Sequence, residues 1–445
     1  MKKMFLFSML AALATLAGCF VMPHPYTGLA PGPWRAVLKL DPKPITPNPK
    51  GEPLPEKVNY EFEEVTEGEL PFLFEVVYDS ETDFHLDIIN GEERIRVDDI
   101  TFGRDIRTAK DTILIRFPVF DSYISAIVES NIMEGLWVVN YRENYSIPFV
   151  AYFGKDYRFS SLKKEPVADI SGRWETTFEP EDEDPYKAVG EFTQSGNRLS
   201  GTFLTETGDY RYLEGTIQAD KIYLSTFDGA HAFLFEGKIL NDGSMIGSFR
   251  SGSHFRSVWE ARRNSEFALS NPDSLTHLMP GVTDFNFSFP NPDGKMVSLS
   301  DPAYQGKVKL VQIMGTWCPN CRDETHFLKE YLDAHPDQDL AVIGLSFERY
   351  DDESRSMAAI RTFREKMALP YEVLLAGNYN KGDAAVRLPM LDRVMSYPTL
   401  IFVDRNNRVR RIHTGFSGPA TKEYESFKAG FQKTIEQLTG EQTTQ

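Results

Sequence analysis

Two cysteines near the C-terminal end of the chain are the residues best suited to chemistry. Cys318 and Cys321 are separated by two residues, and the chain has no second cysteine pair. This spacing suits a redox-active disulfide, a purely structural bridge, or half of a zinc site. A structural zinc needs four ligands, which would have to include histidines such as His326 and His335. A structural bridge over so short a loop constrains the unfolded chain little. We therefore expect thiol–disulfide exchange at this pair, with no metal and with the disulfide itself as the only redox group.

The predicted local structure explains why Cys318 should be the reactive thiol. Residues 308–314 have the composition of a buried strand, and residues 319–335 that of a helix. Cys318 then takes the N-cap position and Pro319 the first helical position, so the sulfur faces free backbone N–H groups at the positive end of the helix dipole. These groups stabilise the thiolate, which is the nucleophile. Cys321 lies one turn inside the helix and is less accessible.

The same alternation of apolar strands and amphipathic helices continues to the end of the chain. Further strands are expected at residues 340–347, 371–375, 399–403 and 409–414, and further helices at 353–367 and 422–438. Strand–helix–strand–helix followed by two strands and a helix is typical of an α/β domain with a central sheet.

Two stretches of this domain resemble the TlpA/ResA-type thiol–disulfide oxidoreductases, an extracytoplasmic branch of the thioredoxin superfamily. Residues 315–324 resemble the active-site stretch of that family, and residues 396–404 its second signature, a cis-proline before a strand. The resemblance covers about a third of the chain. It implies a thioredoxin-like fold over residues 281–440 and an enzyme that exchanges disulfides.

The resemblance also implies the roles of individual residues. Cys318 would be the attacking thiol and Cys321 the resolving thiol. Pro398 would be the cis-proline that faces them, and the backbone of Tyr397 would pair with the substrate chain as an extended peptide pairs with a sheet edge. Trp317 would cover the sulfurs, unless it only fills the core.

Glu324 is the expected proton carrier. In TlpA/ResA-like proteins a glutamate at this place lies near the cysteine pair, and helical spacing puts Glu324 on the same face as Cys321 and Leu328. The alternative is a surface glutamate in a charged first turn. Gln312 stands where cytoplasmic thioredoxins keep a buried aspartate, so proton handling must lie elsewhere or in water.

The N-terminus indicates export. Lys2 and Lys3 precede an apolar run that is too short for a comfortable transmembrane helix but suits a secretory signal. The run ends at Cys19 in a sequence that resembles the bacterial lipoprotein cleavage box. We expect a signal peptide over residues 1–18 and a lipidated Cys19; the alternative is a plain signal peptide with an incidental cysteine.

The next segment, residues 19–57, is proline-rich and is expected to be a linker that holds the folded part off the membrane. Within it, residues 34–40 alternate like a strand, so an edge of the first domain is the competing interpretation.

The middle of the chain is predicted to be mostly β structure, as a sandwich or a small barrel meander. Residues 58–168 contain short apolar runs between polar turns, and in residues 169–263 turn signals such as Thr207-Gly208-Asp209 recur regularly. Gly172-Arg173-Trp174 is similar to the Gly-x-Trp opening of lipocalin-type barrels; a core tryptophan near a turn is the alternative. Residues 264–280 are expected to be a linker.

Composition narrows the function further. The net charge of −17 argues against a nucleic-acid partner.

The expected protein is a lipid-anchored dithiol reductase of the bacterial envelope that faces the periplasm. It would act on exported proteins such as apocytochromes and receive electrons from a membrane thiol reductant. Phe20, in place of an aspartate after Cys19, leans toward the outer membrane.

Three alternatives remain open at this point. The first is that the pair acts as an oxidase or isomerase, because a change of about 30 mV in reduction potential is only about 1.4 kcal/mol. A thiol peroxidase shares the fold, but Gly315 stands where its signature threonine would be. The third alternative is a β-rich region that binds a ligand or partner, with the redox role secondary.

Overall fold

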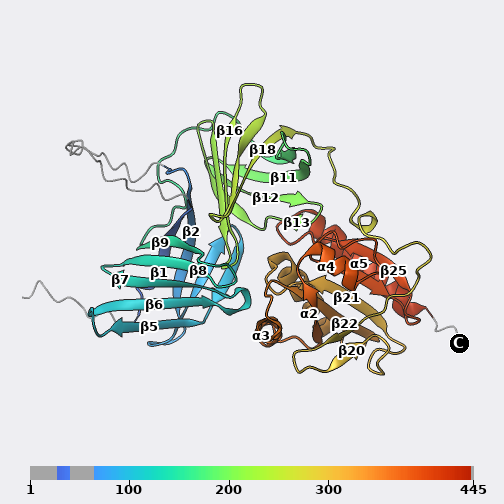
Figure 1. Ribbon diagram of the computed structural model, residues 1–445. Helices are drawn as coiled ribbons and strands as arrows, with labels where there is room; N and C mark the ends of the chain where they lie inside the picture. Colours follow the sequence, from blue (N-terminus) through green and yellow to red (C-terminus); the bar gives the residue numbers. More distant parts are fainter. Residues whose placement is uncertain (1–27, 41–64, 442–445) are drawn as a thin grey trace, which may run out of the picture.

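The computed structural model describes residues 28–40 and 65–441. The predicted signal peptide, Cys19 and most of the predicted proline-rich linker lie outside these residues. The described chain forms two β units followed by an α/β domain (Figure 1). Within the described ranges, no helix is both long and apolar enough to cross a membrane.

The first β unit is a nine-stranded antiparallel sheet with the order β4-β3-β2-β1-β9-β8-β7-β6-β5. Its strands are β1 (Gly32–Lys39), β2 (Glu69–Tyr78), β3 (Phe84–Asn90), β4 (Glu93–Val97), β5 (Ile100–Asp105), β6 (Lys110–Phe117), β7 (Ser122–Glu129), β8 (Ile132–Val139) and β9 (Ser146–Phe153). A 3-10 turn, η2 (Pro118–Phe120), joins β6 to β7.

The prediction of a linker over residues 19–57 was wrong for the residues of strand β1. It lies in the middle of the first sheet, paired with β2 on one side and β9 on the other. Trp34, Ala36 and Leu38 alternate along it and are fully buried. Period-two burial of apolar side chains is what fixes a strand in a sheet, and here it outweighs the proline-rich composition of the flanking sequence.

The second β unit is a closed eight-stranded barrel. Its strands are β10 (Gly172–Phe178), β11 (Tyr186–Ser195), β12 (Arg198–Thr205), β14 (Leu213–Gln218), β15 (Lys221–Phe227), β16 (Ala232–Ile239), β17 (Met245–Ser251) and β18 (Phe255–Arg263). The barrel closes because β11 pairs with both β10 and β12. The short strand β13 (Gly208–Asp209) turns back on the end of β12. Of the two architectures predicted for the β region, this part is the small barrel.

Aromatic rings fill the barrel interior. Phe203 stacks on Phe235 at 4.7 Å, and Phe235 stacks on Phe249 at 4.5 Å between ring centroids. Trp174, in the sequence that resembles the lipocalin opening, is buried, donates to the carbonyl of Ile170 over 2.8 Å and lies under the guanidinium of Arg263. Aromatic side chains therefore pack closely inside the barrel.

The two β units share a core. Phe227, at the end of β15, stacks on Phe72 of the first sheet at 4.4 Å and meets the edges of Phe117 and Trp137. Rings in such contact contribute about 0.5–1.5 kcal/mol beyond the burial of their area. We infer that the two β units hold each other in a fixed relation.

The α/β domain has a five-stranded sheet of order β23-β22-β21-β24-β25. The strands are β21 (Val308–Met314), β22 (Leu340–Glu348), β23 (Glu372–Asn378), β24 (Thr399–Val403) and β25 (Val409–Thr414), and the helices are α2 (Pro319–Ala334), α3 (Glu353–Lys366), α4 (Lys381–Arg387) and α5 (Glu423–Gly440). A hairpin of β19 (Ser288–Pro290) and β20 (Met296–Ser298) precedes them. Strands β21, β22 and β23 are parallel to one another. Strand β24 is antiparallel to β21, and β25 is antiparallel to β24.

Alternate residues of β21 enter two cores on opposite faces of this sheet. Leu310 packs in a cluster with α2, α3 and α5, and Val311 packs in a cluster with the β19–β20 hairpin and α4. All seven residues of β21 are buried. A central strand buried on both faces gives the active-site helix that follows it a rigid support.

The segment 264–280, predicted as a linker, is docked on the α/β domain. It contains a 3-10 turn, η3 (Pro272–Ser274), whose Asp273 carboxylate accepts from Arg411 and His413 of β25, each over 2.8 Å. Thr276 and Thr414 bond through their hydroxyls at 2.9 Å. The polar composition that suggested a free linker therefore provides specific contacts to β25.

Candidate active site around the cysteine pair

Cys318 and Cys321 form a disulfide at the start of α2, with their Cα atoms 5.2 Å apart. Cys318 is the N-cap residue, Pro319 is the first helical residue, and the Cys321 N–H points at the Cys318 sulfur over 3.2 Å. The helix therefore directs a backbone donor and its positive end at this sulfur. Cys318 is 5% exposed and Cys321 is fully buried. This asymmetry suits an outer attacking thiol and an inner resolving thiol.

The loop before β24 brings a proline to the disulfide. The Tyr397–Pro398 peptide bond is cis, and the carbonyl oxygen of Tyr397 lies 3.5 Å from the Cys318 sulfur. This proximity follows from the sheet, because β24 pairs directly with β21, whose end leads into the cysteine pair. Cys318, Tyr397 and Pro398 therefore meet although about 80 residues separate them in the sequence.

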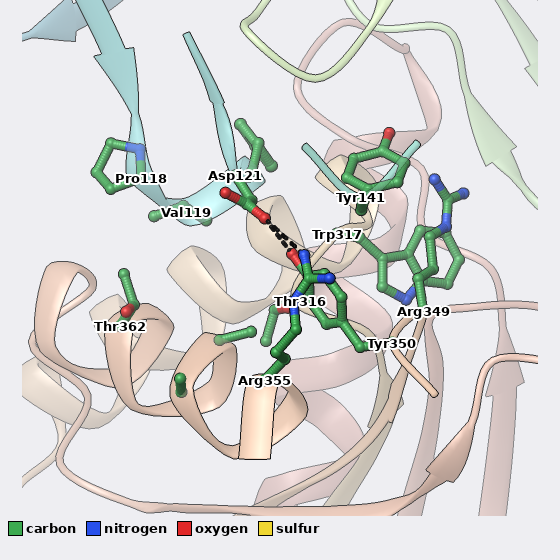
Figure 2. Close-up of a pocket in the computed structure, with 13 residues that line it drawn as sticks. Pro118, Val119, Asp121, Tyr141, Thr316, Trp317, Arg349, Tyr350, Arg355 and Thr362 are labelled. Atoms are coloured by element: carbon green, nitrogen blue, oxygen red, sulfur yellow. Dashed lines mark hydrogen bonds and ion pairs between the residues drawn. The ribbon is translucent and has the colours of Figure 1, made fainter. Parts of the chain in front are cut away.

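Trp317 packs among aromatic and cationic side chains beside the cysteines. Its indole N–H donates to the carbonyl of Phe347 over 2.9 Å, and the guanidinium of Arg349 lies 3.9 Å from the ring centroid. Tyr397 meets the ring edge-on at 5.7 Å. The guanidinium also lies over the ring of Tyr141, which belongs to the first β unit. Figure 2 shows Trp317, Arg349 and Tyr141 together.

Glu324 is buried beneath the cysteine pair rather than exposed in the first turn. One carboxylate oxygen accepts from the side-chain amide of Gln312 over 2.9 Å, and the same amide also donates to the carbonyl of Cys321 over 3.2 Å. Thr325 fixes the amide by donating to its oxygen over 3.0 Å. Gln312, on β21, thus joins the resolving cysteine to the buried carboxylate.

The electrostatics of Glu324 suit a proton carrier. The side chain is fully buried, and among the residues that the structure describes its second oxygen has no hydrogen-bond partner. Burial raises the pKa of Glu324 to about 8, against a smaller lowering by the Gln312 hydrogen bond. A carboxyl group with a pKa near neutrality can both accept and return a proton.

A second buried carboxylate lies behind the same loop and was not predicted from the sequence. Glu348, at the end of β22, accepts from the backbone N–H of Thr316 over 3.1 Å and from its hydroxyl over 2.8 Å. Burial raises the pKa of Glu348 as well. The only signal in the sequence was a glutamate that ends an otherwise apolar strand. Glu348 holds the backbone just before Trp317 and Cys318.

The β units also reach the site, which the sequence did not reveal. A cavity of about 210 Å³ lies between Thr316 and Trp317 on one side and η2 of the first β unit on the other (Figure 2). At its polar end Asp121 accepts from the hydroxyl of Tyr350 over 2.6 Å and pairs with Arg355 at 3.8 Å. On another side, residues 206–209 of the barrel contact the cysteine loop.

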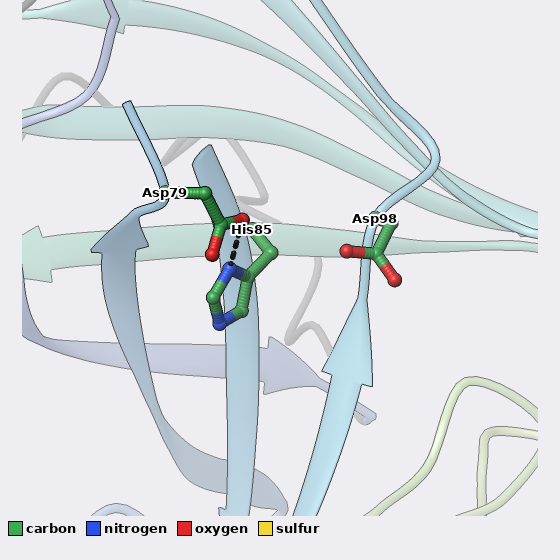
Figure 3. A group of neighbouring side chains, drawn as sticks. All are labelled: Asp79, His85 and Asp98. Atoms are coloured by element: carbon green, nitrogen blue, oxygen red, sulfur yellow. Dashed lines mark hydrogen bonds and ion pairs between the residues drawn. The ribbon is translucent and has the colours of Figure 1, made fainter. Parts of the chain in front are cut away.

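One cluster away from the cysteines has the composition of a metal site. Asp79, His85 and Asp98 lie together in the first β unit (Figure 3). His85 pairs with Asp79 at 2.8 Å, and Arg96 bonds Asp79 over 2.9 Å and Asp98 over 2.8 Å. The Arg96 guanidinium lies between the two carboxylates and bonds one oxygen of each, so a cation at this place would meet a positive side chain.

The C-terminal third of the chain is similar to known proteins. Residues 281–412 match the AhpC/TSA family. The chain is 26% identical over 176 residues to the thiol:disulfide interchange protein DsbE of Escherichia coli K12. The aligned residues cover 38% of this chain and 82% of that relative. It is 28% identical over 130 residues to the thioredoxin-like protein YneN of Bacillus subtilis, an alignment that covers 29% of this chain and 68% of the relative. It is 24% identical over 138 residues to the thiol-disulfide oxidoreductase ResA of Bacillus thuringiensis, covering 31% and 69%. The C-terminal part is a thioredoxin-like domain of the thiol–disulfide oxidoreductase type.

Proposed function

We propose that this protein reduces disulfides in exported proteins, with Cys318 as attacking thiol and Cys321 as resolving thiol. The observation that carries the proposal is the disulfide at the N-terminus of α2, with Cys318 slightly exposed beside a cis-proline and Cys321 fully buried on the side of Glu324. The redox group is the cysteine pair itself.

The first step is attack by the Cys318 thiolate on a substrate disulfide. A bond forms between Cys318 and one substrate sulfur, the substrate S–S bond breaks, and the second substrate sulfur leaves as a thiolate that takes a proton from water. The backbone N–H groups at the start of α2 stabilise the thiolate before attack. The backbone of Tyr397, which lies against the Cys318 sulfur, is positioned to pair with the substrate chain.

The second step releases the substrate. Cys321 gives its proton to the Glu324 carboxylate and attacks the Cys318 sulfur. The mixed disulfide breaks, the remaining substrate sulfur leaves as a thiolate, and the Cys318–Cys321 disulfide forms. Two electrons have then passed from the cysteine pair to the substrate. A thiol reductant of the membrane would return two electrons to the pair by the same exchange in reverse.

Enzyme kinetics test this function directly. Reduced full-length protein should reduce a soluble disulfide substrate such as insulin, and Cys318→Ser should abolish the reaction, because no other cysteine takes its place. Activity that persists in Cys318→Ser would overturn the assignment. The direction is tested in cells: a reductase keeps the pair mainly as a dithiol, whereas a mainly oxidised pair would favour an oxidase.

We further propose that Cys19 is lipidated and anchors the protein to the envelope, facing the periplasm, with the outer membrane favoured by Phe20. Several acyl chains are needed for a durable anchor, since one chain binds only marginally. Cys19→Ser should lose acyl label and retain its signal peptide. Unchanged acylation in this variant would contradict the anchor.

A further inference from the structure

The barrel places a tight turn directly against the cysteine loop. Strand β12 ends at Thr205 and β13 begins at Gly208, so Glu206 and Thr207 form a two-residue turn. We call residues 206–209 the barrel turn. In Figure 1 the side of the barrel that carries β12 and β13 faces the α/β domain.

The barrel turn contacts three elements that surround Cys318. Ser396, two residues before the cis-proline, donates its hydroxyl to the carbonyl of Thr207 over 3.0 Å. Asn320, between the two cysteines, donates its amide to the carbonyl of Asp209 over 3.2 Å. Gly418, in the loop after β25, donates its N–H to the carboxylate of Asp209 over 2.6 Å.

The barrel turn approaches the domain closely at two glycines, and beside these points a cavity of about 140 Å³ remains between Glu206 and Gly415. A Cβ atom at Gly415 would lie 2.8 Å from the carbonyl oxygen of Glu206, and one at Gly208 would collide with the amide of Asn320. Asp209 is buried, and loss of water raises its pKa to about 6. The turn therefore occupies the surface formed by the cis-proline loop, the cysteine loop and the loop after β25.

A buried ion network fixes the barrel turn in this place. Arg211, which follows it by two residues, is 4% exposed and pairs with three carboxylates: Glu93 of the first sheet, Asp228 of the barrel and Asp323 of α2. Removing one partner from a buried ion network costs about 3–5 kcal/mol, so the three parts of the molecule resist separation at this point.

The side of the cysteine loop formed by Thr316 and Trp317 is different. There the first β unit stands back and leaves the cavity of about 210 Å³ lined by Phe120, Asp121 and Tyr141. This cavity borders Thr316 and Trp317, the two residues before Cys318, and offers space for side chains of a chain segment that lies along Trp317. On the opposite side the barrel turn bonds to Asn320 and Ser396.

We propose that the barrel turn is a specificity-determining cover over Asn320 and Ser396, so that disulfides reach the Cys318 sulfur only in flexible chain segments that enter along Trp317 and Tyr397. A disulfide held on the surface of a folded protein cannot bring its backbone to a sulfur recessed behind this cover. The existence of the cover does not depend on the proposed function. The inferred substrate class does rest on the proposed function.

Alkylation of the reduced full-length protein tests the cover without any substrate. The probes are iodoacetamide, which is small, and a maleimide that carries a polyethylene-glycol chain of several kilodaltons. Asp209→Ala removes the acceptor for Gly418 and loosens the turn. The rate for the large probe relative to the small one should rise about tenfold, which corresponds to about 1.4 kcal/mol lost from the docked turn.

Two further variants keep this test decisive. Ser396→Ala removes the contact to Thr207 from the other side of the interface and should shift the ratio in the same direction, even if Asp209→Ala does not fold. Asp242→Ala changes a turn aspartate in the β16–β17 hairpin of the same barrel, where it accepts from Ser244, and should leave the ratio unchanged. An unchanged ratio in Ser396→Ala and in folded Asp209→Ala would overturn the cover.

The substrate class needs a separate measurement. A mixed disulfide with glutathione is placed on an unstructured peptide and, in parallel, on the surface of a folded protein. The reduced wild-type protein should prefer the peptide, and Asp209→Ala should lose most of that preference. Equal rates for both substrates in wild type would contradict the substrate class. Inactivity toward both, with the alkylation result intact, would instead overturn the proposed function.

Discussion

The side-chain amide of Gln312 donates to the carboxylate of Glu324 over 2.9 Å, and it donates to the backbone carbonyl of Cys321 as well. This pair explains how the domain can manage without the buried aspartate that cytoplasmic thioredoxins keep at the position of Gln312. In this domain the buried acidic group, Glu324, lies on the helix, and Gln312 on the strand supplies the amide that orients it. Both side chains are fully buried.

Replacing Glu324 by glutamine tests the proton transfer. The variant Glu324→Gln retains the size and the hydrogen bond to Gln312 but cannot accept a proton from Cys321. We predict that reduction of a small disulfide near neutral pH slows by about a hundredfold, the usual contribution of a positioned acid or base. Glu330→Gln, on the exposed side of the same helix, is the matched control. Equal rates in wild type and Glu324→Gln would reduce Glu324 to a structural residue.

The same carboxyl group makes stability depend on pH. Burial raises the pKa of Glu324 from an ordinary value of 4.5 to about 8 in the folded protein. The folded state therefore binds the proton more tightly than the unfolded state does. The resulting stability is fully present below about pH 4.5 and is lost as the pH rises through about 8.

We predict that the thermal midpoint of the oxidised wild type falls relative to that of Glu324→Gln between about pH 5 and about pH 9. Calorimetry of the two proteins over this range measures the difference, which isolates Glu324 from the other titrating groups. A difference that does not change with pH would show that Glu324 is not protonated in the folded state near neutrality.

The docked segment before the α/β domain predicts a stability effect of its own. Asp273→Asn weakens the contacts to Arg411 and His413. Because Asp273 itself is partly exposed, the expected loss is about 1 kcal/mol in the free energy of unfolding. Denaturant titration of the full chain measures it. Asp156→Asn, an exposed position in the first β unit, should have no effect. An equally stable Asp273→Asn would restore the interpretation of residues 264–280 as a linker.

The α/β domain was predictable because its signals are local. The strand of residues 308–314, the N-cap cysteine and the proline at the first helical position all lie within one short stretch. The site assembled by the sheet was harder: Tyr397 and Pro398 were inferred only through the resemblance. Glu348 and Gln312 act through tertiary contacts that no spacing in the sequence encodes.

The β units show why the rest could not be predicted. Periodicity indicated strands and turns, but not that β11 pairs with β12 to close a barrel or that Phe227 enters the core of the neighbouring sheet. Thr207-Gly208-Asp209 was recognised as a turn, and its contact with the cysteine loop depends on how two separate parts of the chain pack. β1 was assigned to a linker because the proline-rich sequence on both sides outweighed the alternation of residues 34–40, which by itself indicated a strand.

Trapping of the mixed disulfide tests the central claim most directly. In Cys321→Ser the resolving thiol is absent, so a substrate attacked by Cys318 stays bound through one disulfide. We predict that this variant, expressed in full length in its own envelope, accumulates covalent adducts with exported proteins that mass spectrometry assigns to Cys318 and that a reductant releases. Cys318→Ser should give none. Absence of adducts in Cys321→Ser, or equal adducts in Cys318→Ser, would contradict thiol–disulfide exchange through Cys318.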